Sequence, residues 1–121
     1  MIKYVLFTIL LISSCRQKTD VGKYAEQFSA LECKAIYLKD KRYALADRLR
    51  EIEVDSITNR SELDSLNKLI IVTKEESLLL ADSIKYELDD LFTNHLKDPS
   101  DRKLFNETLR KIIETKGCNF Q

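Results

Sequence analysis

Hydrophobic positions recur along the chain at steps of three and four residues, the period of a helix with one buried face. In the first half, this stripe runs through Tyr24, Phe28, Leu31, Ala35, Leu38, Leu45, Leu49 and Ile52. One polar residue, Arg42, interrupts it. The pattern predicts a first helix over about residues 21–57.

A second stripe follows, formed by Leu63, Leu66, Ile70, Thr73, Ser77, Leu80, Ile84, Leu88 and Leu91. Its residues 69–73 are rich in β-branched side chains, but the longer helical period around them favours a helix that ends near Leu96. Thr58 to Arg60 has no apolar anchor and predicts a turn, and Ser61 can cap the helix that follows. Thr73 and Ser77 form a small polar break in this stripe.

A third, shorter helix is predicted after Asp98. The run Asp98-Pro99-Ser100-Asp101 combines a capping residue, a proline suited to the first turn and acids near the positive end of the helix dipole. Its apolar face is formed by Leu104, Phe105, Leu109, Ile112 and Ile113, and Gly117 is placed to end the helix.

These elements predict an all-α fold, a long antiparallel helical hairpin plus a shorter third helix in a three-helix bundle. A short turn forces the two long helices to be antiparallel, and the third helix then runs parallel to the first. The composition agrees, because the chain has 2 glycines, 1 proline and 33% charged residues.

The amino-terminal segment has the layout of a secretory signal peptide. Lys3 precedes an apolar run from Tyr4 to Ile12, and small residues follow it. A membrane-spanning helix needs about 20 apolar residues, so this run is too short to span.

The last four residues of this segment, Ile12, Ser13, Ser14 and Cys15, resemble the lipobox of bacterial lipoprotein precursors. The resemblance implies transfer of diacylglycerol to the Cys15 sulfur, cleavage after Ser14 and acylation of the new amino terminus by a fatty acid such as palmitate. It divides the chain into a signal peptide (1–14), a short tether (15–20) and a helical domain (21–121). Because Arg16 is not an inner-membrane retention signal, we expect a lipid anchor on the periplasmic face of the outer membrane. An ordinary secretory signal or an uncleaved helix are the alternatives.

With Cys15 lipidated, two cysteines remain, Cys33 and Cys118. An even number of thiols in an oxidising compartment predicts a disulfide. The bond would close a loop of about 86 residues, worth up to about 4 to 5 kcal/mol in the chain-entropy model. It would also agree in direction with a third helix that runs parallel to the first. Two unpaired thiols are the alternative.

Charge and motifs argue against nucleic-acid binding, metal binding and catalysis. The chain has 20 basic and 20 acidic residues, without the positive field that nucleic acids require. His95 is the only histidine and lacks companions at metal-ligand spacing. The sequence contains no nucleophile elbow and no glycine-rich phosphate loop. We therefore expect a protein that is not an enzyme and has no cofactor and no metal.

The remaining candidates for function are three tyrosines off the main stripes, Tyr37, Tyr43 and Tyr86, because tyrosine is enriched where proteins meet partners. Packing against the third helix is the other explanation for them. We expect a lipid-anchored envelope protein that binds another protein through its helical surfaces. The alternatives are a small-ligand carrier, with a cavity near Thr73 and Ser77, and a self-associating structural coiled coil.

Overall fold

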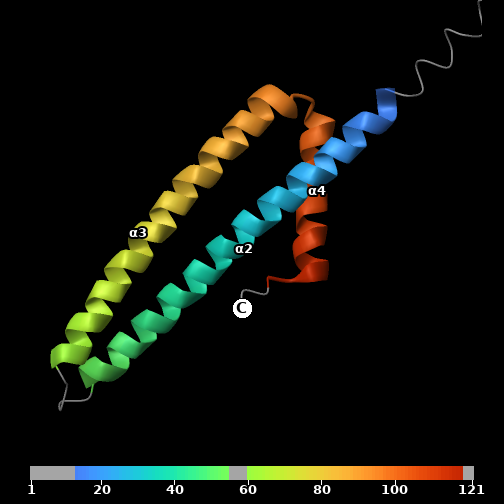
Figure 1. The fold of residues 1–121 in the computed structure, drawn as a ribbon. Coiled ribbons are helices and arrows are strands. Elements are labelled where there is room, and N and C mark those ends of the chain that lie inside the picture. Colours follow the sequence, from blue (N-terminus) through green and yellow to red (C-terminus); the bar gives the residue numbers. More distant parts are fainter. Residues whose placement is uncertain (1–12, 55–59, 119–121) are drawn as a thin grey trace, which may run out of the picture. The chain divides into compact units, whose positions relative to one another are not determined.

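The computed structural model describes residues 13–54 and 60–118, with side chains from residue 20 onward. Its elements are the helices α2 (Ser13–Val54), α3 (Arg60–Asp90) and α4 (Pro99–Lys116), with a π-helical turn η1 (Leu91–His95) between the last two (Figure 1). The described residues contain no strand. The predicted all-α class, with a long hairpin and a shorter third helix, is confirmed.

The chain divides into two compact units. The first comprises Met1–Ala30 and Asp89–Gly117, and the second comprises Leu31–Leu88 and Cys118–Gln121. The long helix α2 therefore contributes its beginning to the first unit and its remainder to the second.

In the first unit, the three helical elements bury a shared aromatic core. Phe105 of α4 is fully buried, and its ring makes edge-to-face contacts with Phe28 of α2 at 5.4 Å and Phe92 of η1 at 5.7 Å between centroids. Val21, Ala25, Leu91 and Leu96 complete the buried set. The beginning of α2, η1 and α4 thus pack around one core in this unit.

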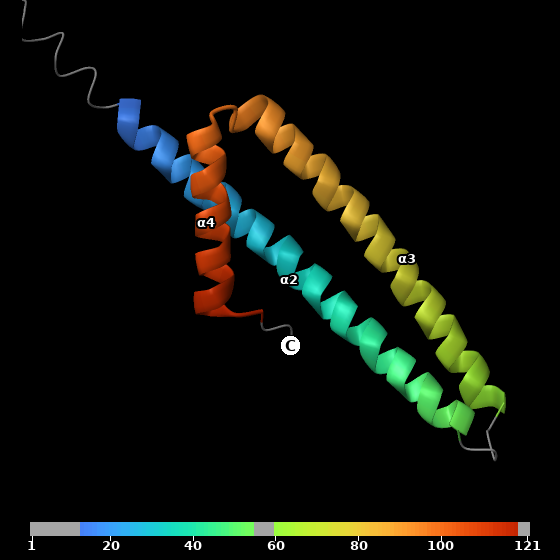
Figure 2. The same cartoon turned by 180° about the vertical axis from the view of Figure 1, so that it is seen from behind.

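Helix α4 runs in the same direction as the beginning of α2, inclined to it (Figure 2). Two ring contacts agree with this direction, because their partners come in the same order along both segments. His95 lies 5.6 Å from Tyr24, and Phe105 lies next to Phe28. The side chain of Asp98 accepts a hydrogen bond from the Ser100 amide at 3.0 Å, as expected for the helix cap.

Arg102 of α4 forms hydrogen bonds to η1 and to the residue that follows it. Its Nε donates to the Leu96 carbonyl at 2.8 Å and its Nη2 donates to the Phe92 carbonyl at 2.7 Å. The guanidinium also lies 5.3 Å from the centre of the Phe92 ring. Carbonyls at the end of a helix lack partners within it, so this side chain satisfies two of them.

In the second unit, α2 and α3 form the antiparallel hairpin (Figure 1). Its buried residues are Leu38, Ile52, Leu66, Thr73 and Leu80, and the other members of both predicted stripes in this unit are half-buried, apart from the exposed Arg42. The β-branched segment 69–73 is helical. The longer period therefore prevails over local strand propensity, as predicted.

Arg48, close to the end of α2, joins this helix to the beginning of α3. Its Nη2 donates to Glu62 Oε1 at 2.6 Å, and its Nη1 donates to Glu51 Oε2 at 3.1 Å. The hydrogen bonds to Glu62 and Glu51 raise the pKa of Arg48 above its ordinary value. The Arg48–Glu62 bond shows which residues of the two helices lie level with one another.

Two predicted helix boundaries are wrong. Helix α2 begins at Ser13 and not near 21, because no glycine or proline interrupts residues 15–20, which were expected to form a tether. Helix α3 begins at Arg60, so Ser61 lies inside its first turn and is not its cap. The predicted turn at Thr58 and Asn59 lies outside the described residues.

Candidate functional site

The predicted lipid-attachment residue, Cys15, falls in the first turn of α2, and its side chain lies outside the part of the molecule that the structure describes. Residues 1–12 of the predicted signal peptide also lie outside it. Among the described helices, none is both long and apolar enough to cross a membrane.

Cys33 and Cys118 form a disulfide, with their Cα atoms 5.1 Å apart. The predicted pairing is confirmed. Cys118 follows Gly117, which ends α4 with φ of 68° while its amide donates to the Ile113 carbonyl at 2.9 Å. This positive φ suits glycine and directs the chain out of the helix toward Cys118.

The three candidate tyrosines are all exposed, with 46% of Tyr37, 65% of Tyr43 and 76% of Tyr86 accessible to solvent. Tyr37 and Tyr43 lie six residues apart, which puts them about 120° apart around α2. Tyr86 belongs to α3. The tyrosines therefore do not form one site, and only Tyr43 lines the groove described next.

A groove of about 520 Å³ lies between the two helices of the hairpin. Its apolar lining consists of Leu45, Ala46, Leu49 and Ile70, with Tyr43 beside them. Its charged lining consists of four basic residues, Lys39, Arg42, Arg50 and Lys74, and one acid, Glu53. This volume is in the range of small-molecule sites, about 300–1,000 Å³.

The groove is not where the sequence suggested a ligand cavity. Thr73 is fully buried and its hydroxyl donates to the Leu69 carbonyl at 2.7 Å, while the Ser77 hydroxyl donates to the Thr73 carbonyl at 2.9 Å. Both hydroxyls are thus satisfied within α3. Neither residue lines the groove, whose α3 residues are Ile70 and Lys74.

The outer face of α3 carries a second feature, an exposed apolar surface. We call it the α3 outer face; its residues are Ile71, Val72, Leu78, Leu79 and Tyr86, each between 49% and 76% exposed. Seven-residue spacing relates Ile71 to Leu78, and Val72 to Leu79 and Tyr86, so these residues form two rows along the helix.

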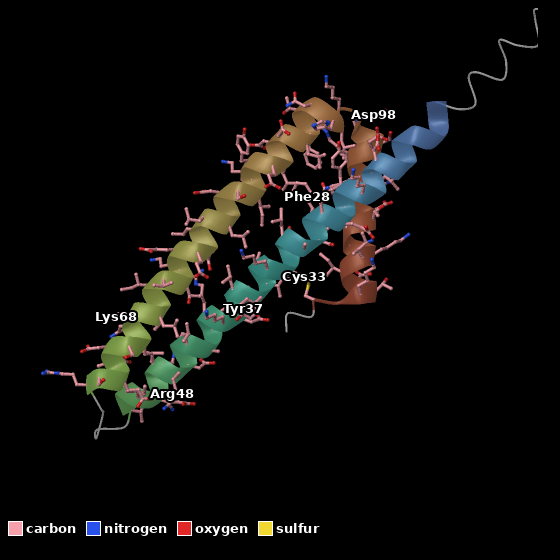
Figure 3. All side chains as sticks on the ribbon, in the orientation of Figure 1. Phe28, Cys33, Tyr37, Arg48, Lys68 and Asp98 are labelled. Atoms are coloured by element: carbon pink, nitrogen blue, oxygen red, sulfur yellow. A yellow bond between two sulfur atoms is a disulfide. The ribbon has the colours of Figure 1, made fainter. Side chains whose placement is uncertain are left out.

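Charged residues with the same spacing, Lys68, Glu75 and Asp82, lie between these two rows. Figure 3 shows Lys68 on the side of α3 that faces away from α2. The face therefore combines apolar rows with a charged row, which is the composition of a surface that another helix can cover.

His95 lies in η1 with its Nε2 3.9 Å from Asp90 Oδ2 and its ring beside Tyr24. Among the described side chains, no group of three or more histidine, cysteine, aspartate or glutamate residues is arranged to hold a metal ion. The contacts of His95 therefore belong to the packing of the first unit.

No protein family, curated protein or solved structure matches this chain. The groove and the α3 outer face therefore have to be interpreted from their own residues.

Sequence reasoning missed both surfaces, although each had a signal. The groove lies where Arg42 interrupts the apolar stripe of α2, and the interruption was visible in the sequence. The α3 outer face was visible as apolar residues that fall outside the core stripe at seven-residue spacing. Arg102, which bridges η1 and α4, had no such signal, because its partners are backbone carbonyls.

Proposed function

We propose that this chain is a lipid-anchored protein of the bacterial envelope that binds another protein through the α3 outer face and catalyses no reaction. The observation that carries the binding proposal is the exposure of Ile71, Val72, Leu78, Leu79 and Tyr86 on one helix. Exposed apolar rows at seven-residue spacing, with charged residues between them, are the kind of surface that a partner helix covers.

The partner that fits this surface is an amphipathic helix. Its own apolar residues would repeat every seven positions and insert between Val72, Leu79 and Tyr86, as knobs insert into holes in coiled coils. Basic residues on the partner would face Glu75 and Asp82, and an acid would face Lys68. Tyr86, the most exposed residue of the α3 outer face, has the size and the polar tip of a typical interface anchor.

The anchoring proposal is supported by the sequence Ile12-Ser13-Ser14-Cys15 and by the disulfide. Disulfides persist in oxidising compartments such as the periplasm and are rare in the cytosol. Acyl chains on Cys15 would hold the protein at the membrane, since each buried methylene contributes about 0.8 kcal/mol and several chains together give stable anchoring. We place the anchor on the periplasmic face of the outer membrane.

The binding proposal is tested by photo-crosslinking in living bacteria, with a photoreactive phenylalanine at Leu79 or at Ala81. Ala81 is the matched control, because it is exposed on the same helix but about 160° away from Leu79. We expect one defined adduct from position 79 that is absent from position 81. The Val72→Glu substitution should abolish the adduct, and the purified partner should bind the parent chain but not this variant.

Equal adducts from both positions would contradict the proposal. An adduct of twice the mass of the chain would instead support the self-associating coiled coil. Turnover of a substrate from a broad hydrolase panel by the purified protein would refute the non-catalytic role.

The anchoring proposal is tested by the intact mass of the mature protein isolated from membranes. We expect a mass that includes acyl chains on Cys15 and lacks residues 1–14, and a Cys15→Ala variant that is neither processed nor acylated in this way. A chain without acyl groups would overturn the anchoring and leave the α3 outer face untouched.

A further inference from the structure

We propose that the groove between α2 and α3 binds a long-chain fatty acid, with the carboxylate at one end of the groove and the alkyl chain along its apolar floor. This site is separate from the α3 outer face, so the two proposals stand or fall independently. Four observations support it: the break in the helix stripe, the composition of the lining, the placement of the basic groups and their lack of partners.

The groove exists because of a break in the core of the hairpin. Arg42 occupies the stripe between Leu38 and Leu45, where an apolar side chain would pack against α3, but it is exposed. The residues next to it on the groove floor are only half-buried: Leu45, Ala46, Leu49 and Ile70. The lining thus offers apolar surface that an alkyl chain can cover.

The basic residues are not spread evenly along the groove. The bond between Arg48 of α2 and Glu62 of α3 gives a common reference level for the two helices. Lys39 precedes Arg48 by nine residues, and Lys74 follows Glu62 by twelve. At 1.5 Å per residue, Lys39 and Lys74 lie about 14 and 18 Å from that bond, and are therefore nearly level. Arg42, six residues before Arg48, lies about 9 Å from the bond, just under one turn closer to it than Lys39.

Lys39, Arg42 and Lys74 therefore form a basic end to the groove. None of the three makes an ion pair with any other side chain that the structure describes. The opposite end is nearly neutral, because Arg50 bonds to Asp47 at 3.3 Å and Glu53 lies beside it. A negative group is thus favoured at one end only.

This polarity fits a molecule with one anionic head and one apolar tail. From Lys39 to Glu53 the lining extends about 21 Å along α2, which suits an extended alkyl chain. The groove volume of about 520 Å³ is that of a site for one small molecule, and not for the larger body of a two-chain phospholipid. We therefore assign a free fatty acid, and not a two-chain phospholipid, as the occupant.

The experiment uses the full mature protein and a fluorescent polyene fatty acid, displaced by palmitate below its aggregation concentration. We expect palmitate to compete, and the alcohol of the same chain length to compete about 10-fold less well, because it lacks the charge that the basic end attracts. Arg42→Glu should weaken palmitate binding about 10- to 100-fold. Ala46→Phe should abolish binding by filling the groove.

Lys34→Glu is the matched control for Arg42→Glu, since Lys34 is exposed on α2 and outside the groove, and the change in net charge is the same. It should bind palmitate like the parent chain. Circular dichroism and the state of the disulfide establish that each variant is folded.

Three results would overturn this inference. The first is no displacement by palmitate, and the second is equal binding by the folded Ala46→Phe variant. The third is binding only to phosphatidylglycerol vesicles with loss in Arg42→Glu, which would assign the basic residues to the membrane surface. Crosslinking at position 79 would be unaffected by any of them.

Discussion

Replacing Phe105 with alanine should remove the centre of the core in the first unit. Phe105 is fully buried, and its ring contacts Phe28 from α2 and Phe92 from η1 in edge-to-face geometry. Each of the three elements contributes one ring, so this single substitution weakens all of their mutual contacts.

The expected loss of stability follows from the burial of Phe105 and from its two ring contacts. Truncation of a buried phenylalanine to alanine costs about 3–5 kcal/mol, and each edge-to-face pair adds about 0.5–1.5 kcal/mol beyond the buried area. Since Phe105 loses two such pairs, we expect a loss of at least about 4 kcal/mol in the free energy of unfolding. That is a large share of the 5–15 kcal/mol that is typical of folded domains.

Urea unfolding, followed by far-ultraviolet circular dichroism with the disulfide intact, measures this loss. Phe105→Leu, which keeps part of the volume, should lose only about 1–2 kcal/mol. Asn106→Ala, at the exposed neighbouring position, should change stability by less than about 0.5 kcal/mol. A loss for Phe105→Ala below about 1.5 kcal/mol would refute the aromatic core as the main stabilising contact of this unit.

Three further predictions concern stability and use the same assay. The double substitution of Cys33 and Cys118 with serine should cost up to about 4.5 kcal/mol, because the bond closes a separation of 85 residues; an unchanged midpoint would contradict this. Arg102→Ala should cost about 1.5–3 kcal/mol through its lost bonds to two carbonyls, whereas a loss within 0.5 kcal/mol would mean that water replaces it fully. Gly117→Ala should cost about 1–3 kcal/mol because of its φ of 68° and ψ of 179°. Gly22→Ala should instead stabilise the protein by about 0.5–1 kcal/mol, because Gly22 lies in the interior of α2 with open space around the added carbon. A change of the same sign for both glycines would refute the argument that backbone conformation decides their effects.

Much of the fold could be predicted because its causes are local. Periodicity identifies the buried faces of all three helices, and Asp98 and Gly117 have the residue types that start and end α4. The disulfide could be predicted from cysteine count and compartment, since Cys33 and Cys118 are the pair left after Cys15.

The remaining features depend on contacts between elements. An exception is the beginning of α2, which lies before the predicted start because the helix continues toward the amino terminus beyond Tyr24, the first residue of the apolar stripe. Arg102 shows no pattern in the sequence, because backbone carbonyls accept its hydrogen bonds. The groove needs both helices in register, which the Arg48–Glu62 bond reveals only in three dimensions.

Arg42 connects the stability of the hairpin to the proposed ligand. It occupies a core position of α2, where a leucine would bury apolar surface against α3 and stabilise the hairpin by about 1–2 kcal/mol. The same leucine would remove a basic group from the groove and occupy part of its volume. We therefore expect Arg42→Leu to raise the urea midpoint while it lowers palmitate affinity about 10-fold or more.

An arginine retained where leucine packs better is typical of a site whose function costs stability. Asp40→Leu is the control, because Asp40 is exposed, lies about 160° around α2 from Arg42 and is outside the groove, and this change should leave both measurements nearly unchanged. If Arg42→Leu fails to stabilise the protein, position 42 does not face the core. If it stabilises the protein and palmitate still binds as before, the groove results from imperfect packing and does not bind the fatty acid through Arg42.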